Sequence, residues 1–369
     1  MIRLFQRSIF KTAACLLFVV SCTKPEAPLS YEDAKVKAEA GNAKAQFQLG
    51  YMYEYGEGVL EDDEDAVKWY TKAAKQGNRY AQHNLGNMYA YGDGVSQDDD
   101  EALKWYRKAA EQGLMLSQYR IASGYYDDDF YFTNLDHPEA LKWHTKAAEQ
   151  GHVEAQIELA YKYRYGKGVV EDDVEAVKWY RKAANQGSPE GQMQLGDMYF
   201  DGHGVPEDHN KALKWYISAA EQGEVQAEST LALIYDEGIG IQKNDVEAVK
   251  WYKKIAERNV PSAQYELGIK YATGAGVSED DVEAVKWYRM AAKQGYAKGQ
   301  YNLGIKYATG EGVPQDSIKA YMWTSLAQTE GLSGVEDVKN DLVTKMTIAE
   351  ISTAKEMARV CYESQYENC

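Results

Sequence analysis

The chain has 369 residues, of which 44% are hydrophobic, and it carries a formal net charge of −16 at pH 7. This acidic balance argues against binding nucleic acid through a broad basic face, because contacts to phosphate need clustered lysine and arginine. It also argues against adsorption over a wide area of anionic lipid. We therefore expect no nucleic-acid partner.

The N-terminus has the pattern of an export signal. Three basic residues precede an apolar run over residues 13–20, and Val-Val-Ser then leads to Cys22. A positive start, a short apolar run and small residues before a cleavage site indicate a secretory signal peptide. A permanent membrane-spanning helix would need roughly 20 apolar residues. We expect residues 1–21 to be the signal and residues 22–30 to be a short tether.

The end of this signal resembles the lipobox of bacterial lipoproteins. The resemblance implies that Cys22 is diacylated, that the chain is cleaved before it and that the new N-terminus is acylated. Two or more acyl chains anchor a protein stably. Thr23 differs from the aspartate that typically retains such proteins at the inner membrane. The expected location is the cell envelope, at the outer membrane, on its periplasmic or surface face. An ordinary signal peptide with a chance cysteine is the alternative.

The tryptophans reveal a repeat. All eight occur at one phase, from Trp69 to Trp323, with gaps of 36 residues except for one of 38. Regular self-similarity at this period is typical of solenoids. Eight units begin at Ala45, Ala81, Ser117, Ala155, Gly191, Ala227, Ala263 and Gly299.

Each unit is predicted to be a helical hairpin. In the first unit Ala45, Leu49 and Tyr53 have helical spacing, and the second half repeats such a face over residues 66–74. Gly-Glu-Gly-Val at residues 56–59 forms the turn between them, where glycine tolerates unusual backbone angles. A Gln-Gly pair then ends the second helix. Such a hairpin cannot bury its own apolar face, so stacking of hairpins gives a solenoid.

The motifs A-x-x-x-L-G-x-x-Y, G-x-G-V and A-x-x-W-Y-x-x-A-A resemble those of the Sel-one-like repeat family (SLR), relatives of the tetratricopeptide repeats. The resemblance implies an all-α fold, a right-handed α-solenoid of eight 36-residue helix-turn-helix repeats over residues 31–331. Capping helices would occupy residues 332–369. Members of the family serve as adaptors in many unrelated processes. The resemblance therefore implies a non-enzymatic scaffold without identifying its partner.

Two further helices are predicted after the repeats, over residues 335–345 and 348–362. Thr347-x-x-Glu350 has the pattern of a capping box for the second of them.

Cys361 and Cys369 are the cysteines that remain after export and lipidation, and an oxidising periplasm could pair them. On one continuous helix they would lie roughly 12 Å apart, which is too far for a disulfide. The bridge requires the tail to turn back after about residue 362; a buried Cys361 with a loose Cys369 is the alternative.

Acidic loops precede the second helices. They lack the alternating oxygen donors, central glycine and final glutamate of a known calcium loop. We instead expect carboxylates there to cap free N–H groups at the positive end of the helix dipole. The predicted capping residues are Asp63, Asp99, Asp173, Asp245 and Asp281. No metal site is expected, and the six histidines show no paired ligand spacing.

Ser352-x-x-Lys355 matches the shortest signature of serine beta-lactamases and penicillin-binding proteins. The partner motifs S-D-N and K-T-G are absent, and no repeat has the cysteine pair of the relatives linked to beta-lactam binding. The glycine pairs are turns and not phosphate loops. We therefore expect no catalytic residue, no cofactor and no small-molecule substrate. Beta-lactamase-like or penicillin-binding activity is kept as an alternative function.

On the first helix of each unit, one stripe varies between units. It consists of the residues that lie 2, 6 and 9 positions after the first residue of the unit (offsets 2, 6 and 9). In tetratricopeptide-like solenoids the corresponding stripe lines the concave surface. Aromatic residues and arginine are enriched at binding hot spots. A protein or peptide is predicted to bind this groove through Phe47, Tyr51, Tyr119, Tyr126, Tyr161, Arg164, Phe200, Tyr265 and Tyr301. The alternative is that some of these residues belong to the solenoid core.

The sixth unit departs from the repeat, with Glu257-Arg258-Asn259 in place of Glu-Gln-Gly. We expect this departure to alter the local curvature. A third functional hypothesis is a structural role in an envelope or polysaccharide-export assembly. In each of these hypotheses the chain contacts the membrane through its lipid anchor only.

Overall fold

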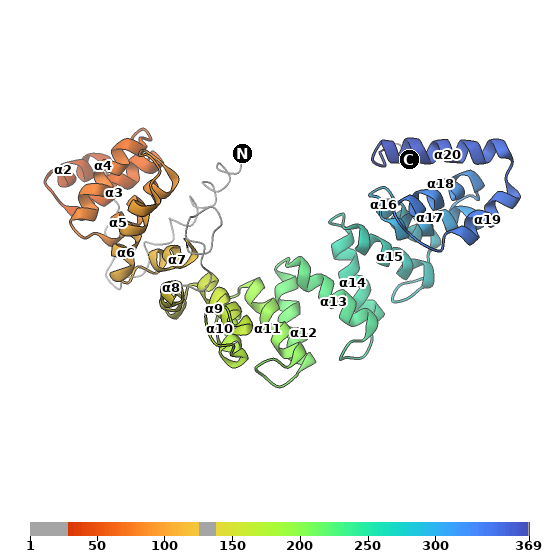
Figure 1. Cartoon of the computed structure of the whole chain (residues 1–369), viewed down its shortest axis with the longest axis horizontal. Coiled ribbons are helices and arrows are strands. Elements are labelled where there is room, and N and C mark those ends of the chain that lie inside the picture. Colours follow the sequence, from red (N-terminus) through yellow and green to blue (C-terminus); the bar gives the residue numbers. More distant parts are fainter. Residues whose placement is uncertain (1–28, 125–137, 368) are drawn as a thin grey trace. The chain divides into compact units, whose positions relative to one another are not determined.

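The computed structural model describes residues 29–124, 138–367 and 369. The expected signal peptide, the lipidation residue Cys22, most of the tether and the groove candidate Tyr126 lie outside these residues. Within the described residues all regular structure is helical, with 19 helices and no strand. The predicted all-α class and the series of helical hairpins are therefore confirmed (Figure 1).

The chain divides into two compact parts between residues 155 and 156. The first contains α2 (Tyr31–Glu39), α3 (Ala43–Tyr55), α4 (Asp63–Lys75), α5 (Arg79–Tyr91), α6 (Asp99–Glu111), α7 (Met115–Gly124) and α8 (Pro138–Glu149). Helix α9 (Val153–Tyr165) begins just before the division.

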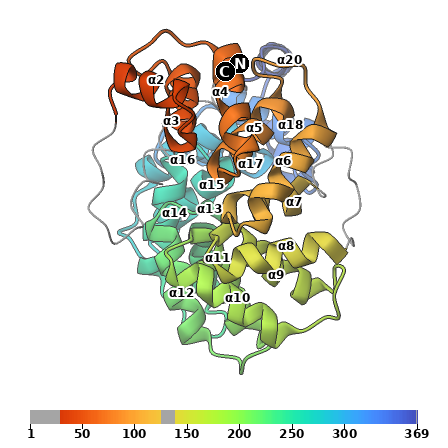
Figure 2. The same ribbon diagram turned by 90° about the vertical axis from the view of Figure 1, so that its left-hand side faces the viewer.

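The second part continues with α10 (Asp173–Asn185), α11 (Pro189–Asp201), α12 (His209–Glu221), α13 (Val225–Glu237), α14 (Asp245–Ala256), α15 (Pro261–Thr273), α16 (Asp281–Ala292), α17 (Ala297–Thr309), α18 (Ser317–Thr329), α19 (Glu336–Lys345) and α20 (Ile348–Glu363). Within each part the two helices of a hairpin lie side by side, as α3 does with α4 and α11 with α12 (Figures 1 and 2).

The core of a hairpin joins a first-helix leucine to second-helix alanine and tyrosine. In the first hairpin Leu49, Ala66 and Tyr70 are fully buried, and burying such a leucine stabilises the fold by roughly 2 kcal/mol. A Cβ at Gly50 would lie 2.7 Å from Cδ1 of Tyr70, inside the contact distance of two carbons. The glycine of the Leu-Gly motif therefore lets the tyrosine ring pack directly on the first helix. The same approach recurs at Gly86, Gly196 and Gly268.

The two glycines of each inter-helix turn have different roles. Gly92 ends α5 in the left-handed conformation, with φ 72°, as expected for a helix stop. Gly94 also has a positive φ, and a Cβ there would lie 2.3 Å from the backbone oxygen of Asp63 in the preceding unit. The second glycine thus permits close contact between successive hairpins. Gly204, Gly276 and Gly312 make the same approach.

Aspartate, or asparagine in the sixth unit, caps seven of the second helices, one position earlier than predicted. Asp62 precedes α4 with φ −152°, and its side chain accepts from the backbone N–H of Asp65. The capping residue must have extended backbone and lie outside the helix, whereas Asp63 is already its first helical residue. The observed capping residues are Asp62, Asp98, Asp172, Asp208, Asn244, Asp280 and Asp316.

Buried glutamines connect successive hairpins. Gln46 Nε2 donates to the backbone oxygen of Ala38 at 3.0 Å, and Gln46 Oε1 accepts from Gln76 Nε2 at 2.7 Å. Equivalent pairs are Gln82–Gln112, Gln118–Gln150, Gln156–Gln186, Gln192–Gln222 and Gln264–Gln294. In the sixth unit Glu228 and Arg258 form an ion pair at this place. The irregular residues of that unit therefore have a partner in its first helix.

Helices α19 and α20 follow the repeats close to the predicted bounds, and the Thr347–Glu350 capping box is present. Cys361 and Cys369 form a disulfide with their Cα atoms 5.0 Å apart. Beyond α20 the backbones of Gln365 and Tyr366 are left-handed, with φ 51° and 68°. The tail thus makes the turn that the bridge requires, and it ties the chain end to the buried Cys361.

Candidate partner-binding face

The stripe predicted on the first helices is half-buried. Among its described candidates the exposed fraction is largest at Tyr161, at 46%. Phe47 and Tyr51 of α3, Tyr119 of α7, Arg164 of α9, Phe200 of α11, Tyr265 of α15 and Tyr301 of α17 have intermediate exposure. Each of these side chains is therefore partly covered by its neighbours.

Aromatic rings at offset 2 lie between adjacent hairpins. The Phe47 ring lies 5.9 Å from the ring of Tyr70 in its own hairpin and 5.9 Å from that of Tyr80, in α5 of the next hairpin. Tyr265 repeats the arrangement, with Tyr288 at 6.1 Å and Tyr296 at 5.5 Å. Rings in this row thus contribute to packing between units as well as to the face.

Tyr119 and Phe200 contact histidine instead. Tyr119 stacks on His152 with ring centroids 4.2 Å apart, and Phe200 meets His209 edge to face at 4.7 Å. His152 lies between α8 and α9, whereas His209 is the first residue of α12. Each ring also lies near a second aromatic residue, Tyr119 near His144 at 6.1 Å and Phe200 near Tyr216 at 6.4 Å, so both rings are held by their neighbours.

Offset 6 pairs with offset 10, which the sequence stripe omitted. Tyr51 lies 4.5 Å from Tyr55 and Tyr161 lies 4.6 Å from Tyr165, measured between ring centroids. Tyr165 is 47% exposed and Tyr91, at the same offset, is 50% exposed. Residues four apart share one side of a helix, so adding the position four residues after offset 6 would have found this row.

Polar side chains of the face are bonded to second-helix tyrosines. Tyr70 Oη donates to Glu54 at 2.5 Å and accepts from Asn84 Nδ2 at 3.0 Å. Tyr216 Oη donates to Asp197 at 2.8 Å. Burial raises the pKa of Glu54 to about 7, although the Tyr70 hydrogen bond lowers it. Burial likewise raises the pKa of Asp197.

Arg164 is the cation of the stripe. Its Nη1 donates to Gln194 Oε1 at 3.2 Å, its Nη2 lies 4.0 Å from Asp201 Oδ2, and its guanidinium lies 5.3 Å from the ring centre of Tyr165. The side chain is 14% exposed. Its direction is therefore fixed by α11 and by the neighbouring tyrosine, and it lies beside the exposed Tyr161–Tyr165 pair.

Other candidate chemistry has little support in the described residues. Ser352 is exposed on α20, with no partner motif in the chain. No group of three or more histidine, cysteine, aspartate or glutamate side chains in the described ranges is placed to hold a metal ion. None of the helices in those ranges is both long and apolar enough to span a membrane.

The hairpin array with its Leu-Gly, G-x-G and Trp-Tyr positions defines an α-solenoid of the tetratricopeptide-like class. The Sel1 repeat model matches the chain at residues 43–78, 79–114, 116–152, 153–188, 189–224, 225–260, 261–296 and 297–329. The chain therefore belongs to the Sel1 repeat family. These repeats build helical scaffolds that are generally non-catalytic and commonly mediate contacts between proteins.

Solved structures of this family resemble the chain. A Sel1 repeat protein from Oxalobacter formigenes is 31% identical, with a TM-score of 0.63 over 88% of this chain and 97% of that one. The protective antigen c5321 of uropathogenic Escherichia coli, which displays an SLR fold, is 30% identical over 92% of this chain and 96% of that one, with a TM-score of 0.43.

Among curated proteins, the chitin synthase regulator SKT5 of Saccharomyces cerevisiae is 60% identical over 37 residues. The match covers 10% of this chain and 5% of the yeast protein. One repeat unit accounts for a segment of this length, so the similarity concerns the repeat alone.

Proposed function

We propose that the chain is a lipid-anchored adaptor of the cell envelope that binds a protein or peptide through the first-helix face of its repeats. The main support is the Tyr161–Tyr165 pair, because both rings are nearly half exposed on an otherwise packed hairpin. Packing within the unit does not demand two exposed rings at these positions. Large exposed aromatic side chains of this kind are typical of interaction sites.

Arg164 strengthens the assignment. Its guanidinium is held by Gln194 and Asp201, so little side-chain entropy is lost when a partner contacts it. Tyrosine likewise supplies a large contact area with few rotatable bonds. The combination suits a segment that presents apolar side chains together with backbone carbonyl groups, to which Arg164 and the tyrosine hydroxyls can donate hydrogen bonds.

Partner binding is tested by affinity capture from solubilised envelopes with three baits. These are the wild type, a Tyr161→Ala/Tyr165→Ala variant and a Val174→Ala/Val246→Ala control, whose valines are 53% and 63% exposed on second helices. Loss of two hot-spot rings should weaken binding about thirtyfold or more, at roughly 2 kcal/mol or more. Equal recovery by all three folded baits would refute binding at this face.

A photo-reactive residue gives a second measurement. Leu233 of α13 occupies the same row as Tyr161 and is 46% exposed. A cross-linker in place of Leu233 should label the captured partner, whereas one in place of Val246 should not. Labelling from Val246 alone would place the contact on the second helices instead.

Lipid anchoring and envelope location rest on residues 1–23 of the sequence. Metabolic labelling with an alkyne fatty acid should mark the wild type, and Cys22→Ser should abolish the label and release the chain from the membrane fraction. Persistent labelling of Cys22→Ser would overturn the anchor. Recovery of the wild type in the outer-membrane fraction would support the proposed leaflet, and recovery with the inner membrane would contradict it.

A further inference from the structure

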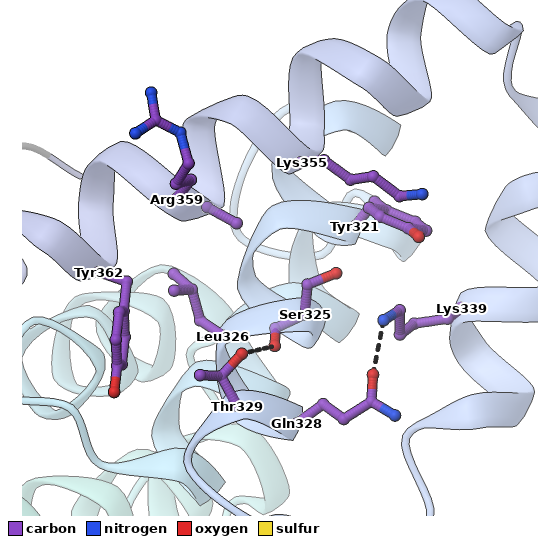
Figure 3. Close-up of a pocket in the computed structure, with 10 residues that line it drawn as sticks. Tyr321, Ser325, Leu326, Gln328, Thr329, Lys339, Lys355, Arg359 and Tyr362 are labelled. Atoms are coloured by element: carbon purple, nitrogen blue, oxygen red, sulfur yellow. Dashed lines mark hydrogen bonds between the residues drawn. The ribbon is translucent and has the colours of Figure 1, made fainter.

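A cleft of about 310 Å³ lies where α18, α19 and α20 meet (Figure 3). It is remote in sequence from the first-helix face of the earlier units, and its lining comes from the last second helix and from the two helices after the repeats. Tyr321 and Ser325 of α18, Lys339 of α19, and Lys355 and Arg359 of α20 contribute to it.

Two of the three cations at the cleft have no carboxylate partner. Neither Lys339 nor Lys355 forms an ion pair with any described residue, although most lysines near the second-helix starts do so. Lys339 Nζ donates to Gln328 Oε1 at 2.7 Å and lies 5.1 Å from the ring centre of Tyr321. The nearby acid Glu336 accepts from Gln328 Nε2 at 3.1 Å. The cleft is thus locally positive in a strongly acidic chain.

Arg359 differs from the two lysines. Its guanidinium is bonded to Glu356 and Glu363 on α20 itself, at 2.6 to 3.0 Å. Figure 3 shows this group pointing away from Lys339 and Lys355. Only the lysine ammonium groups are therefore available to a ligand in the cleft.

The base of the cleft holds a hydroxyl without a hydrogen-bond partner. Ser325 Oγ is buried and makes no hydrogen bond to any described residue, while its backbone oxygen accepts from Thr329 Oγ1 at 3.1 Å. Figure 3 shows the Ser325 hydroxyl directed into the space beside Tyr321 and Lys339. An unsatisfied buried hydroxyl costs free energy, and a ligand oxygen in the cleft would remove that cost.

We propose that this cleft binds a phosphate group, with Lys339 and Lys355 facing its charge and Ser325 donating to one of its oxygens. Burial and the charge of the neighbouring Lys355 hold the pKa of Lys339 below its ordinary value. An anion between the two ammonium groups would offset both effects. A phosphate dianion balances both charges, whereas a carboxylate balances one. The assignment is independent of partner binding at the first-helix face.

The test is isothermal titration of inorganic phosphate into the full chain at constant ionic strength. Lys339→Gln and Lys355→Gln should each weaken binding about tenfold or more, the usual effect of losing a charge-assisted hydrogen bond. Ser325→Ala should weaken it severalfold. Lys345→Gln is the matched control, because Lys345 pairs with Asp341 at the end of α19 and does not line the cleft. Circular dichroism establishes that each variant is folded.

Two further arms identify the ligand. Acetate should bind more weakly than phosphate, and equal affinity would overturn the assignment to a dianion. Vesicles that contain phosphatidic acid, compared with phosphatidylcholine alone, distinguish a lipid headgroup from a soluble phosphate compound. Absence of saturable binding in both the phosphate and the phosphatidic acid arms would overturn the proposal, as would equal weakening by Lys345→Gln.

Discussion

In the sixth unit a buried acid occupies the place of the glutamine that connects hairpins in the other units. Glu228 is fully buried, with Lys254 Nζ at 2.8 Å and Arg258 Nη1 at 2.7 Å from its carboxylate oxygens. A carboxylate cannot donate to the carbonyl that the equivalent glutamine bonds in other units. Lys254 Nζ makes that bond instead, to the backbone oxygen of Ala220 at 2.9 Å. Glu228, Lys254 and Arg258 thus jointly replace a glutamine pair.

Arg258→Gln removes one of the two cations and leaves Glu228 buried. Breaking a buried ion pair costs about 3–5 kcal/mol when no other partner remains. Lys254 remains here, and Arg258 is 36% exposed, so water screens part of the lost attraction. We expect a loss of about 2 kcal/mol. The double variant Glu228→Gln/Arg258→Gln restores the glutamine pair and should lie within about 1 kcal/mol of the wild type.

Urea unfolding of the full chain, together with hydrogen exchange of amides in α13 and α14, measures these effects. Local exchange is needed because a long repeat array need not unfold as one unit. Lys250→Gln is the control, since Lys250 pairs with Glu247 on the surface at 3.4 Å and its loss should cost at most about 0.5 kcal/mol. An Arg258→Gln effect no larger than the control, or a double variant as unstable as the single one, would refute the reasoning.

Three further sets of substitutions test the repeat. Gly94→Ala should lower the free energy of unfolding by more than about 3 kcal/mol, because its Cβ would clash with the Asp63 carbonyl. Gly113→Ala is the control: it has φ 81° but no atom within 4 Å, and it should cost only about 1–2 kcal/mol. Equal unfolding midpoints for the two variants would contradict this. Because burial raises the folded-state pKa of Glu54 from 4.5 to about 7, stability falls as pH rises through that interval. Glu54→Gln should therefore stabilise by up to about 3 kcal/mol above pH 7 and have little effect below pH 4.5, and a pH-independent effect in urea titrations would argue against it. Asp280→Ala should cost about 1 kcal/mol while Asp280→Asn should be nearly neutral, and calorimetry that finds the two alike would rule out a capping role.

Sequence periodicity predicted most of the fold, because each unit repeats the same local signals. The spacing of Leu49 and Tyr53, the position of the tryptophan and the turn glycines recur in all or nearly all of the eight units. A chance irregularity in one unit therefore does not change the prediction that the other units support. The position of the helix caps was less well determined. Adjacent acids such as Asp62 and Asp63 both suit a helix start, and only the backbone angle of Asp62 distinguishes the cap.

The candidate face was predicted in outline only. Offset 2 was assigned to binding with the rest of the stripe, but the rings of Phe47 and Tyr265 also pack between hairpins. Whether a residue on a helix meets solvent or the next unit depends on how successive hairpins are stacked, and periodicity within one helix does not contain that information. The stripe takes offset 9 after offset 6 and so leaves out the exposed Tyr165 at offset 10, four residues after Tyr161.

The sequence by itself determined the class, the eight hairpins and the residues available for capping, because these depend on interactions between residues near each other in the chain. The tertiary structure decided which distant residues meet. Glu228 and Arg258 are 30 residues apart, and Ser325, Lys339 and Lys355 come from three helices. No spacing rule connects such residues, since the distance between them is set by the packing of helices and not by the helical period.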